Sequence, residues 1–356
     1  MSLRVVKPGA LSSLQDLGRA GYQRFGVIAS GVMDEWSHRV ANLLVGNACD
    51  EATLEITLLG PSLVFEASTL VCLTGADLAP RIAGSVVPMN RPVLVRKGAQ
   101  LDFGGRVSGC RAYLAVHGGF SVEPVMGSRS TYLRAGLGGF EGRALRKGDV
   151  LATGGSNHLR LYPGLGAALE ASGDPFVSFA ESRFAPVDHP SRRLARARGA
   201  DPATDAAAPG DGEPTITIRA IAGQQWEAFD EAARKNFFGS PYLVGLNSDR
   251  MGFRMEGPAL GLRAPLEMIS QGVTFGTVQV PPDGQPIVLM ADRQTAGGYP
   301  KIASVAAVDL PLLAQCLPRD AVRFERVTLD HAQRLLLARE QALSAVREST
   351  EQLTGD

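Results

Sequence analysis

The chain has no excess of either charge and no long apolar run, and it lacks the marks of nucleic-acid or membrane proteins. Lys plus Arg and Asp plus Glu number 36 each among 356 residues, so the formal net charge is zero. No Lys/Arg block is interleaved with aromatic residues, as is typical of nucleic-acid binders. No apolar run approaches the roughly 18 residues of a membrane span, and the N-terminus lacks a signal-peptide core. We therefore expect a soluble cytoplasmic protein with neither kind of partner.

Several motifs that mark common enzyme classes are also missing. The four cysteines are scattered without a CxxC pair, and no HExxH pattern occurs, so we expect reduced thiols and no metal site. Without a GxxxxGK[ST] loop, any ATP is not held in the Walker manner. The absence of a GxSxG elbow and of an Ala-Met-Lys-Met sequence argues against an acyl-transfer serine and against biotin attachment to this chain.

What the chain has in abundance is turn residues between short β-rich segments. It contains 41 glycines and 22 prolines, and turns recur every eight to twelve residues over long stretches. Strands are expected at 63–65, 69–74, 93–95, 112–116, 215–218 and 287–289. Helices are expected at 34–45, at 225–237 and over about the last 25 residues. The spacing favours a mainly β fold of barrels or sandwiches over βαβ units.

The length and a local change of composition predict the domain organisation. A chain of 356 residues is expected to form at least two domains. Residues 187–214 are rich in Arg, Ala, Asp, Pro and Gly and are interpreted as a mobile connector. The predicted order is an N-terminal β lobe (1–186), the connector (187–214), a C-terminal β lobe (215–327) and a C-terminal helix (328–356).

The most informative polar segment is 292–301, which follows the strand expected at 287–289. It combines Asp292, Gln294, Thr295 and Lys301 with the pair Gly297-Gly298, and Tyr299-Pro300 stiffens its exit. Adjacent glycines let a backbone approach a ligand closely. The segment predicts a site for an anionic or strongly polar small molecule, such as a phosphate or carboxylate species. The alternative is a tight turn whose polar groups satisfy only its own backbone.

Four further segments carry more polar groups than folding requires. Gln15, Asp16 and Arg19 share an early loop, Asp249 and Arg250 repeat the carboxylate–guanidinium pairing, and 127–131 offers Ser128 in a possible oxyanion cradle. Residues 279–286 are predicted to form a rigid hairpin turn with glutamine side chains at its rims. Each Asp–Arg pair is equally interpretable as a structural clasp.

Taken in order, nine segments resemble one family. They are SSLQDLGRAGYQRFGV, SGVMDEWSHRVANLLVGN, LEITLLGP, LTGAD, YLAVHGG, GSRSTYLRAGLGGFEGRAL, SDRMGFRMEGP, VQVPPDGQPIVLMADRQTAGGYPKIA and DLPLLAQ. They are similar to the KipA family, also called allophanate hydrolase subunit 2-like, biotin-dependent carboxyltransferase or the 5-oxoprolinase C subunit. The resemblance covers about residues 5–324. The chain departs from the pattern in a longer connector at 187–214 and in Leu317-Pro318-Arg319-Asp320, where a Pro-Gly-Asp turn is usual.

The resemblance implies two cyclophilin-like β-barrel lobes without prolyl isomerase activity. It also implies three functional hypotheses. The first is one subunit of a 5-oxoprolinase that uses ATP with Mg in the holo-complex, acts with KipI-like and LamB/YcsF-like subunits, and is inactive alone. The second is carboxyl transfer to urea or a related amide from biotin on a separate carrier. The third is a regulatory protein that antagonises a KipI-like kinase inhibitor. Homo-oligomer formation is left open.

Under the first hypothesis, each candidate residue has an expected role. Lys301 and Arg250 would stabilise an anion, and Asp292 would handle a proton or a metal-bound phosphate. Gln294 and Thr295 would hydrogen-bond the substrate, and Asp16 and Arg19 would form the opposite wall. The remaining residues expected to line the site are Gln15, Ser128, Gly297, Gly298 and Tyr299.

Overall fold

The computed structural model describes residues 1–154, 162–179 and 215–355, which divide into two compact units. Within these ranges the first unit comprises 1–19, 34–154, 162–179 and 340–355. The second comprises 20–33 and 215–339. Each unit is therefore assembled from segments far apart in the sequence. The predicted connector at 187–214 lies outside the described residues, and the linear boundaries at 186, 214 and 327 stay predictions.

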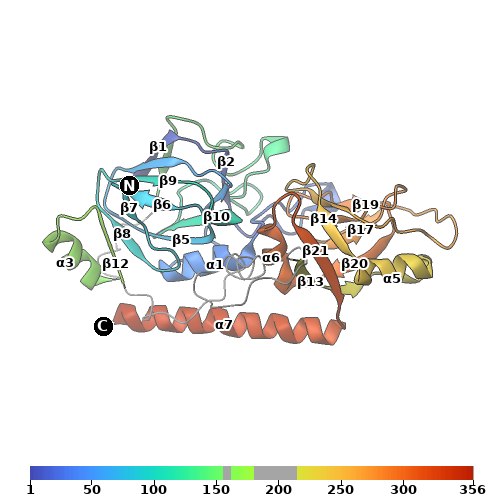
Figure 1. Ribbon diagram of the computed structural model, residues 1–356. Helices are drawn as coiled ribbons and strands as arrows, with labels where there is room; N and C mark the ends of the chain where they lie inside the picture. The colour runs from blue at the N-terminus through green and yellow to red at the C-terminus, as the bar shows by residue number, and fades with distance from the viewer. Residues whose placement is uncertain (155–161, 180–214, 356) are drawn as a thin grey trace. The chain divides into compact units, whose positions relative to one another are not determined.

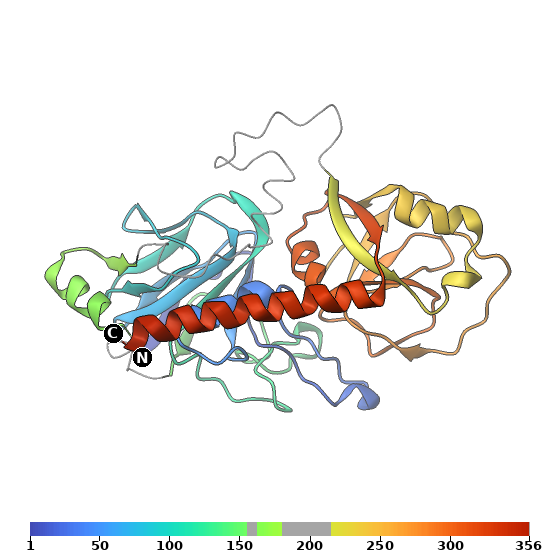
Figure 2. The same cartoon turned by 90° about the horizontal axis from the view of Figure 1, so that it is seen from below.

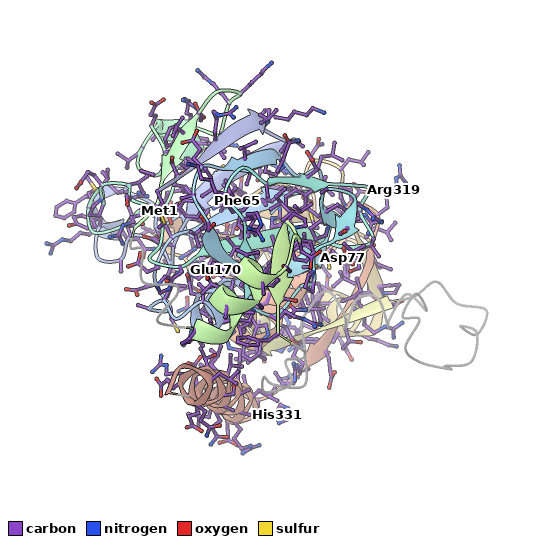
Figure 3. The ribbon with its side chains drawn as sticks, turned by 90° about the vertical axis from the view of Figure 1, so that its left-hand side faces the viewer. Met1, Phe65, Asp77, Glu170, Arg319 and His331 are labelled. Atoms are coloured by element: carbon purple, nitrogen blue, oxygen red, sulfur yellow. The ribbon has the colours of Figure 1, made fainter. Side chains whose placement is uncertain are left out.

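The first unit is built from two six-stranded sheets that share one hydrophobic core. The first sheet, in spatial order, consists of β11 (Val150–Ala152), β1 (Ser2–Lys7), β4 (Ser62–Phe65), β9 (Gln100–Phe103), β6 (Pro80–Ile82) and β7 (Ser85–Val86). The second consists of β12 (Phe176–Ser178), β8 (Val93–Val95), β5 (Thr69–Asp77), β10 (Ser108–Val116), β3 (Thr53–Thr57) and β2 (Leu11–Gln15). Because side chains alternate along a strand, one face of each sheet supplies this core. Phe65, labelled in Figure 3, and Leu114 belong to it and are fully buried.

Helix α1 (Glu35–Leu44) lies along β5 and β10 of the second sheet (Figure 1). Its residues Val40 and Leu44 pack with Cys72 and Ala115, which alternate with the residues of the shared core. Asp34 caps the helix by accepting hydrogen bonds from the backbone nitrogen and the hydroxyl of Ser37, at 2.9 and 2.7 Å. The helix expected at 34–45 is thus confirmed. Helix α3 (Pro163–Ala171), on which Glu170 is labelled in Figure 3, packs against β8 and β12.

The second unit contains a closed seven-stranded barrel. In spatial order its strands are β13 (Thr215–Ala222), β20 (Lys301–Val305), β17 (Thr277–Gln279), β18 (Ile287–Leu289), β15 (Gly252–Glu256), β14 (Pro241–Val244) and β21 (Ala321–Arg326). The parallel pair β13–β21, visible in Figure 2, closes the ring. Phe237 and Phe324 stack in its core with ring centroids 4.6 Å apart. The mainly β fold is confirmed, as a closed barrel here and as two facing sheets in the first unit.

The predicted helix at 225–237 is interrupted. It becomes a 3-10 turn (Trp226–Ala228) followed by α5 (Glu231–Gly239), because Asp230 caps a new helix by accepting from the nitrogen of Ala233 at 2.7 Å. Two further helices are α6 (Leu310–Ala314) and α7 (Leu329–Gly355). Among the helices of the described residues, none combines the length and apolar character needed to cross a membrane.

Candidate functional site

The centre of the candidate site is a pair of polar side chains on the outer face of the barrel. Gln279 of β17 and Lys301 of β20 are partners across these antiparallel strands. The strands shift register between Val278 and Gln279. Val278 and Val280 on one strand and Ile302 on the other belong to the barrel core, so Gln279 and Lys301, their neighbours in sequence, point outward. Cross-strand partners lie side by side. Both residues are nevertheless buried, at 2% and 6% exposure.

A second strand pair lies over the first. Strands β16 (Gln271–Gly272) and β19 (Ala296–Gly297) pair antiparallel, with Gln271 opposite Gly297, and we call these four residues the flap. The ammonium of Lys301 donates to Oε1 of Gln271 at 3.1 Å. Gly297 lies against Gln279, since a Cβ atom placed on Gly297 would stand only 2.1 Å from Nε2 of Gln279. The flap pair therefore faces the barrel pair, one contact on each side.

The contact between Gly297 and Gln279 explains one of the two adjacent glycines in the segment 292–301. Neither Gly297 nor Gly298 has the positive φ that favours glycine. Gly297 leaves room for the amide of Gln279, which any side chain at this position would displace. At Gly298 the nearest atom to an added Cβ is the hydroxyl of Ser270, at 3.4 Å, which is an ordinary contact. The glycine pair thus serves close packing at one position rather than backbone freedom at both.

The electrostatics of the barrel pair favour a polar ligand. Burial lowers the pKa of Lys301 below that of an ordinary lysine. Nε2 of Gln279 is buried and has no hydrogen-bond partner among the described residues. A buried donor without an acceptor is unfavourable in a folded protein and is frequently found where a ligand or water binds. The pair therefore combines an ammonium group whose charged form is disfavoured by burial with an amide N–H that has no acceptor among the described residues.

Asp292 and Arg250 form a separate centre in the same unit. Arg250 donates from Nε and Nη2 to the two carboxylate oxygens of Asp292, both at 3.0 Å, and its carbonyl accepts from the backbone nitrogen of Asp292 at 2.7 Å. Ser30 donates to the same carboxylate at 2.8 Å, and Arg250 also donates to the carbonyl of Gly31 at 2.5 Å. These bonds tie residues 30 and 31 to the barrel. Arg250 thus pairs with the carboxylate of Asp292, and the carboxylate of Asp249 accepts from the backbone nitrogen of Met251.

The other predicted residues of this segment lie at the surface around the flap. Gln294, Gly298 and Tyr299 are exposed, and Thr295 is half-buried. Gln23, in the 3-10 turn Gln23–Phe25, donates to the carbonyls of Val273 and Thr295 at 3.0 and 2.8 Å. The end of the flap formed by Gly272 and Ala296 is thereby held to the segment 20–33 of the same unit.

In the first unit, Asp16 organises the loop predicted as an oxyanion cradle. Its carboxylate accepts from the hydroxyls of Ser128 and Ser130 and from the backbone nitrogens of Arg129 and Gly18, at 2.5 to 2.8 Å. Burial would raise the pKa of Asp16, but these hydrogen bonds outweigh it and hold the pKa below its usual value. Ser128 is thus committed to Asp16, and this contact holds the loop 127–131 to the end of β2.

Gln15 and Arg19 join the same loop. Arg19 is fully buried and donates to the carbonyls of Ser130 and Val125, at 2.6 and 3.2 Å. Gln15 donates to the carbonyl of Thr131 at 3.1 Å, while its buried Oε1 has no hydrogen-bond partner among the described residues. The structure therefore gathers Gln15, Asp16, Arg19 and Ser128 in the first unit. The residues predicted from 250 and 292–301 gather in the second.

Gln271 and Gln279 are the two site residues that the sequence analysis did not assign. Gln279 opens the segment 279–286, which was predicted as a hairpin with glutamines at its rims. The signal that could have found it is the alternation Val278-Gln279-Val280, which places one polar residue among buried apolar ones. Gln271 lies in the mixed segment Ser270-Gln271-Gly272-Val273-Thr274 and has no comparable signal.

Within the described residues, no group of three His, Cys, Asp or Glu side chains could hold a metal ion. The four cysteines have free thiols. The two centres therefore offer the amide and ammonium groups of Gln279 and Lys301, and the guanidinium and carboxylate groups of Arg250 and Asp292.

Comparison with known proteins shows that this chain is similar to carboxyltransferase-domain proteins. The family model "Carboxyltransferase domain, subdomain A and B" matches residues 25–326. The chain belongs to this family, and the resemblance carried by the nine ordered segments is confirmed.

Two curated relatives match almost end to end. The 5-oxoprolinase C subunit of Haemophilus influenzae is 36% identical over 336 residues, 94% of each chain. The protein of the same name from Escherichia coli is 34% identical over 330 residues, 93% of each. Among solved structures, the urea carboxylase of Kluyveromyces lactis is similar over 98% of this chain, with 29% identity and a TM-score of 0.79. This chain spans 29% of that much longer protein.

Proposed function

We propose that this chain is the C subunit of an ATP-dependent 5-oxoprolinase, which converts 5-oxoproline, ATP and water into glutamate, ADP and phosphate. The support is the end-to-end similarity to two relatives that carry this name. Their name makes those relatives members of an assembly. We therefore propose that this chain acts with KipI-like and LamB/YcsF-like subunits and is inactive alone.

The observation that carries the proposal is the buried ammonium of Lys301 against a side-chain amide carbonyl. The bond that breaks in 5-oxoproline is also an amide bond, between its carbonyl carbon and ring nitrogen. Lys301 would donate to the lactam oxygen as negative charge develops there. Because burial lowers its pKa, Lys301 would also release a proton more readily than a surface lysine, toward the departing nitrogen.

The other candidate residues are proposed in supporting roles. Gln294, Thr295 and Tyr299 lie on the loop around the flap and would contact the rest of the substrate. Arg250 and Asp292 were predicted to stabilise an anion and to handle a proton. Their mutual ion pair favours a role in holding the loop beside the barrel, and a direct catalytic role stays a prediction. The residues Gln15, Asp16, Arg19 and Ser128 of the first unit stay candidates for substrate contact.

ATP and Mg are proposed for the assembly as a whole. The two acidic candidates, Asp16 and Asp292, already accept hydrogen bonds from hydroxyl, backbone and guanidinium donors. These residues therefore do not fit a magnesium nucleotide, and no step through ATP is derived for this chain.

The test is 5-oxoproline-dependent ATP hydrolysis by this chain reconstituted with its KipI-like and LamB/YcsF-like partners. Replacing Lys301 with Ala is expected to lower turnover by about 10²-fold or more, the scale of a lost transition-state contact. Lys235→Ala removes an exposed lysine of the same unit and serves as the matched control. Turnover by Lys301→Ala within about twofold of the wild-type rate would contradict the role of Lys301.

The second candidate function is biotin-dependent carboxyl transfer to urea or a related amide. The observation that favours it is the similarity to Kluyveromyces lactis urea carboxylase over nearly the whole chain. Biotin would arrive on a separate carrier. A neighbouring gene for a biotin carboxylase, with urea-dependent ATP hydrolysis, would favour this function, whereas a neighbouring LamB/YcsF-like gene favours the oxoprolinase. A purely regulatory protein would bind its KipI-like partner and support no turnover with any combination of partners.

A further inference from the structure

The side chain that contacts Lys301 is itself a primary amide. Oε1 of Gln271 accepts from the Lys301 ammonium at 3.1 Å, although Gln271 is an exposed residue of a two-residue strand. An exposed glutamine loses side-chain entropy when it is held in one position. The contact is favourable only because it satisfies a buried cation, whose solvation by water is otherwise incomplete. A carbonyl oxygen of another molecule would satisfy it equally well.

The second group at this position is the amide of Gln279. Its Nε2 lies against Gly297 and has no acceptor among the described residues. Gln279 and Lys301 are cross-strand partners, so their polar ends project from the same face of the barrel. Movement of the flap away from this face would uncover both donors together, because Gln271 and Gly297 are themselves cross-strand partners.

We propose that Gln271 occupies the position of the substrate's amide carbonyl. When substrate binds, its carbonyl oxygen replaces that of Gln271 on Lys301, and Nε2 of Gln279 becomes the second donor. The site would thus recognise a planar amide carbonyl, with Gln271 as an intramolecular competitor. This inference rests on the proposed function for its choice of substrate, but it applies to any small amide.

The inference predicts opposite effects for the two glutamines. Gln271→Ala removes the competitor and should tighten substrate binding about three- to tenfold, the range of one modest hydrogen bond. Gln279→Met keeps the length of the side chain without its donor and should weaken binding by a similar or larger factor. If both glutamines had only structural roles, both variants would bind substrate more weakly than the wild type. Gln285→Ala, which removes a half-buried glutamine side chain that is hydrogen-bonded to the backbone of Gly257, should leave substrate binding unchanged.

The experiment measures Kd by calorimetry for the purified chain, and KM and kcat for the reconstituted complex, with 5-oxoproline and with urea as probes. Tighter binding by Gln271→Ala together with weaker binding by Gln279→Met supports the inference for whichever probe shows it. If that pattern appears with urea and not with 5-oxoproline, the site stands and the oxoprolinase proposal fails. If Gln271→Ala binds substrate no more tightly than the wild type and 5-oxoproline turnover is intact, the proposed role of Gln271 is wrong. The proposed oxoprolinase function then still stands. Absence of binding and turnover with either probe overturns the inference.

Discussion

At the scale of single residues, the pair Arg250–Asp292 is the strongest candidate for a stabilising contact. Both side chains are less than 10% exposed and share two hydrogen bonds of 3.0 Å. Removing one partner of a buried ion pair leaves the other charge uncompensated, so Arg250→Met should lower the free energy of unfolding by about 3–5 kcal/mol. Urea denaturation measures this, with the exposed Arg254 changed to Met as the control.

The double variant Arg250→Met with Asp292→Leu separates charge from packing. It should recover much of the lost stability, because no charge remains buried without a partner. It should still show impaired activity if either residue contacts the substrate. A double variant as unstable as the single one would mean that packing, and not charge, makes Arg250 important.

The residue types of this pair were predicted, but their partnership was not. Asp249 and Arg250 were expected to pair because they are adjacent. In the structure, Asp249 accepts from the nitrogen two residues ahead, at 2.8 Å, as Asp16 does with Gly18. This turn is a local preference of aspartate. Arg250 pairs with the carboxylate of Asp292, 42 residues away, and that pairing depends on the closure of the barrel, which no local pattern contains.

At the scale of elements, the flap depends on the absence of a side chain at one position. Gly297→Ala would place a Cβ atom 2.1 Å from Nε2 of Gln279, which is the end of a flexible side chain. We expect the amide to move rather than the strands, so substrate affinity should fall while unfolding changes by less than about 1 kcal/mol. Gly272→Ala, on the other strand of the flap, is the matched control, because an added Cβ there would meet no atom within 4 Å.

A double-mutant cycle on KM or Kd tests whether Gly297→Ala lowers substrate affinity by displacing the amide of Gln279. If Gly297→Ala acts through Gln279, it should have little further effect once Gln279 is Met, because the displaced donor is already gone. Additive losses would show that the flap itself is distorted.

Several strands and the start of α1 were predictable because they follow local rules. Turn residues bound the strands, and Asp34 caps α1 as its side chain dictates. The flap was not predicted. Its strands have two residues each, too few for a period-two pattern, and they pair only because the barrel carries 271 and 297 to the same place. The assignment of residues 20–33 to the second unit likewise depends on long-range bonds such as those of Gln23.

At the scale of the whole molecule, the buried His38 of α1 should control the stability of the first unit toward acid. His38 is fully buried, and its Nδ1 lies 2.8 Å from the hydroxyl of Thr53. Burial lowers the pKa of His38 from 6.5 to about 4. In the unfolded chain His38 therefore binds a proton as the pH falls below 6.5, whereas in the folded chain it binds one only near pH 4. Stability should fall across this window, by roughly 3 kcal/mol in total, and the contribution of His38 should level off below it.

The chain offers a separate reporter for each unit, since its two tryptophans divide between them. Trp36 lies on α1 of the first unit, Trp226 lies in the second, and both are buried. In a Trp226→Phe background, the fluorescence of Trp36 should report a loss of stability between pH 6.5 and 4, and His38→Gln should flatten it. His331→Gln, which changes an exposed histidine of α7, should leave the slope intact. In a Trp36→Phe background, Trp226 should show the same pH dependence only if the two units unfold in one cooperative step. An unaltered slope in His38→Gln would mean that another group carries the acid sensitivity of the first unit.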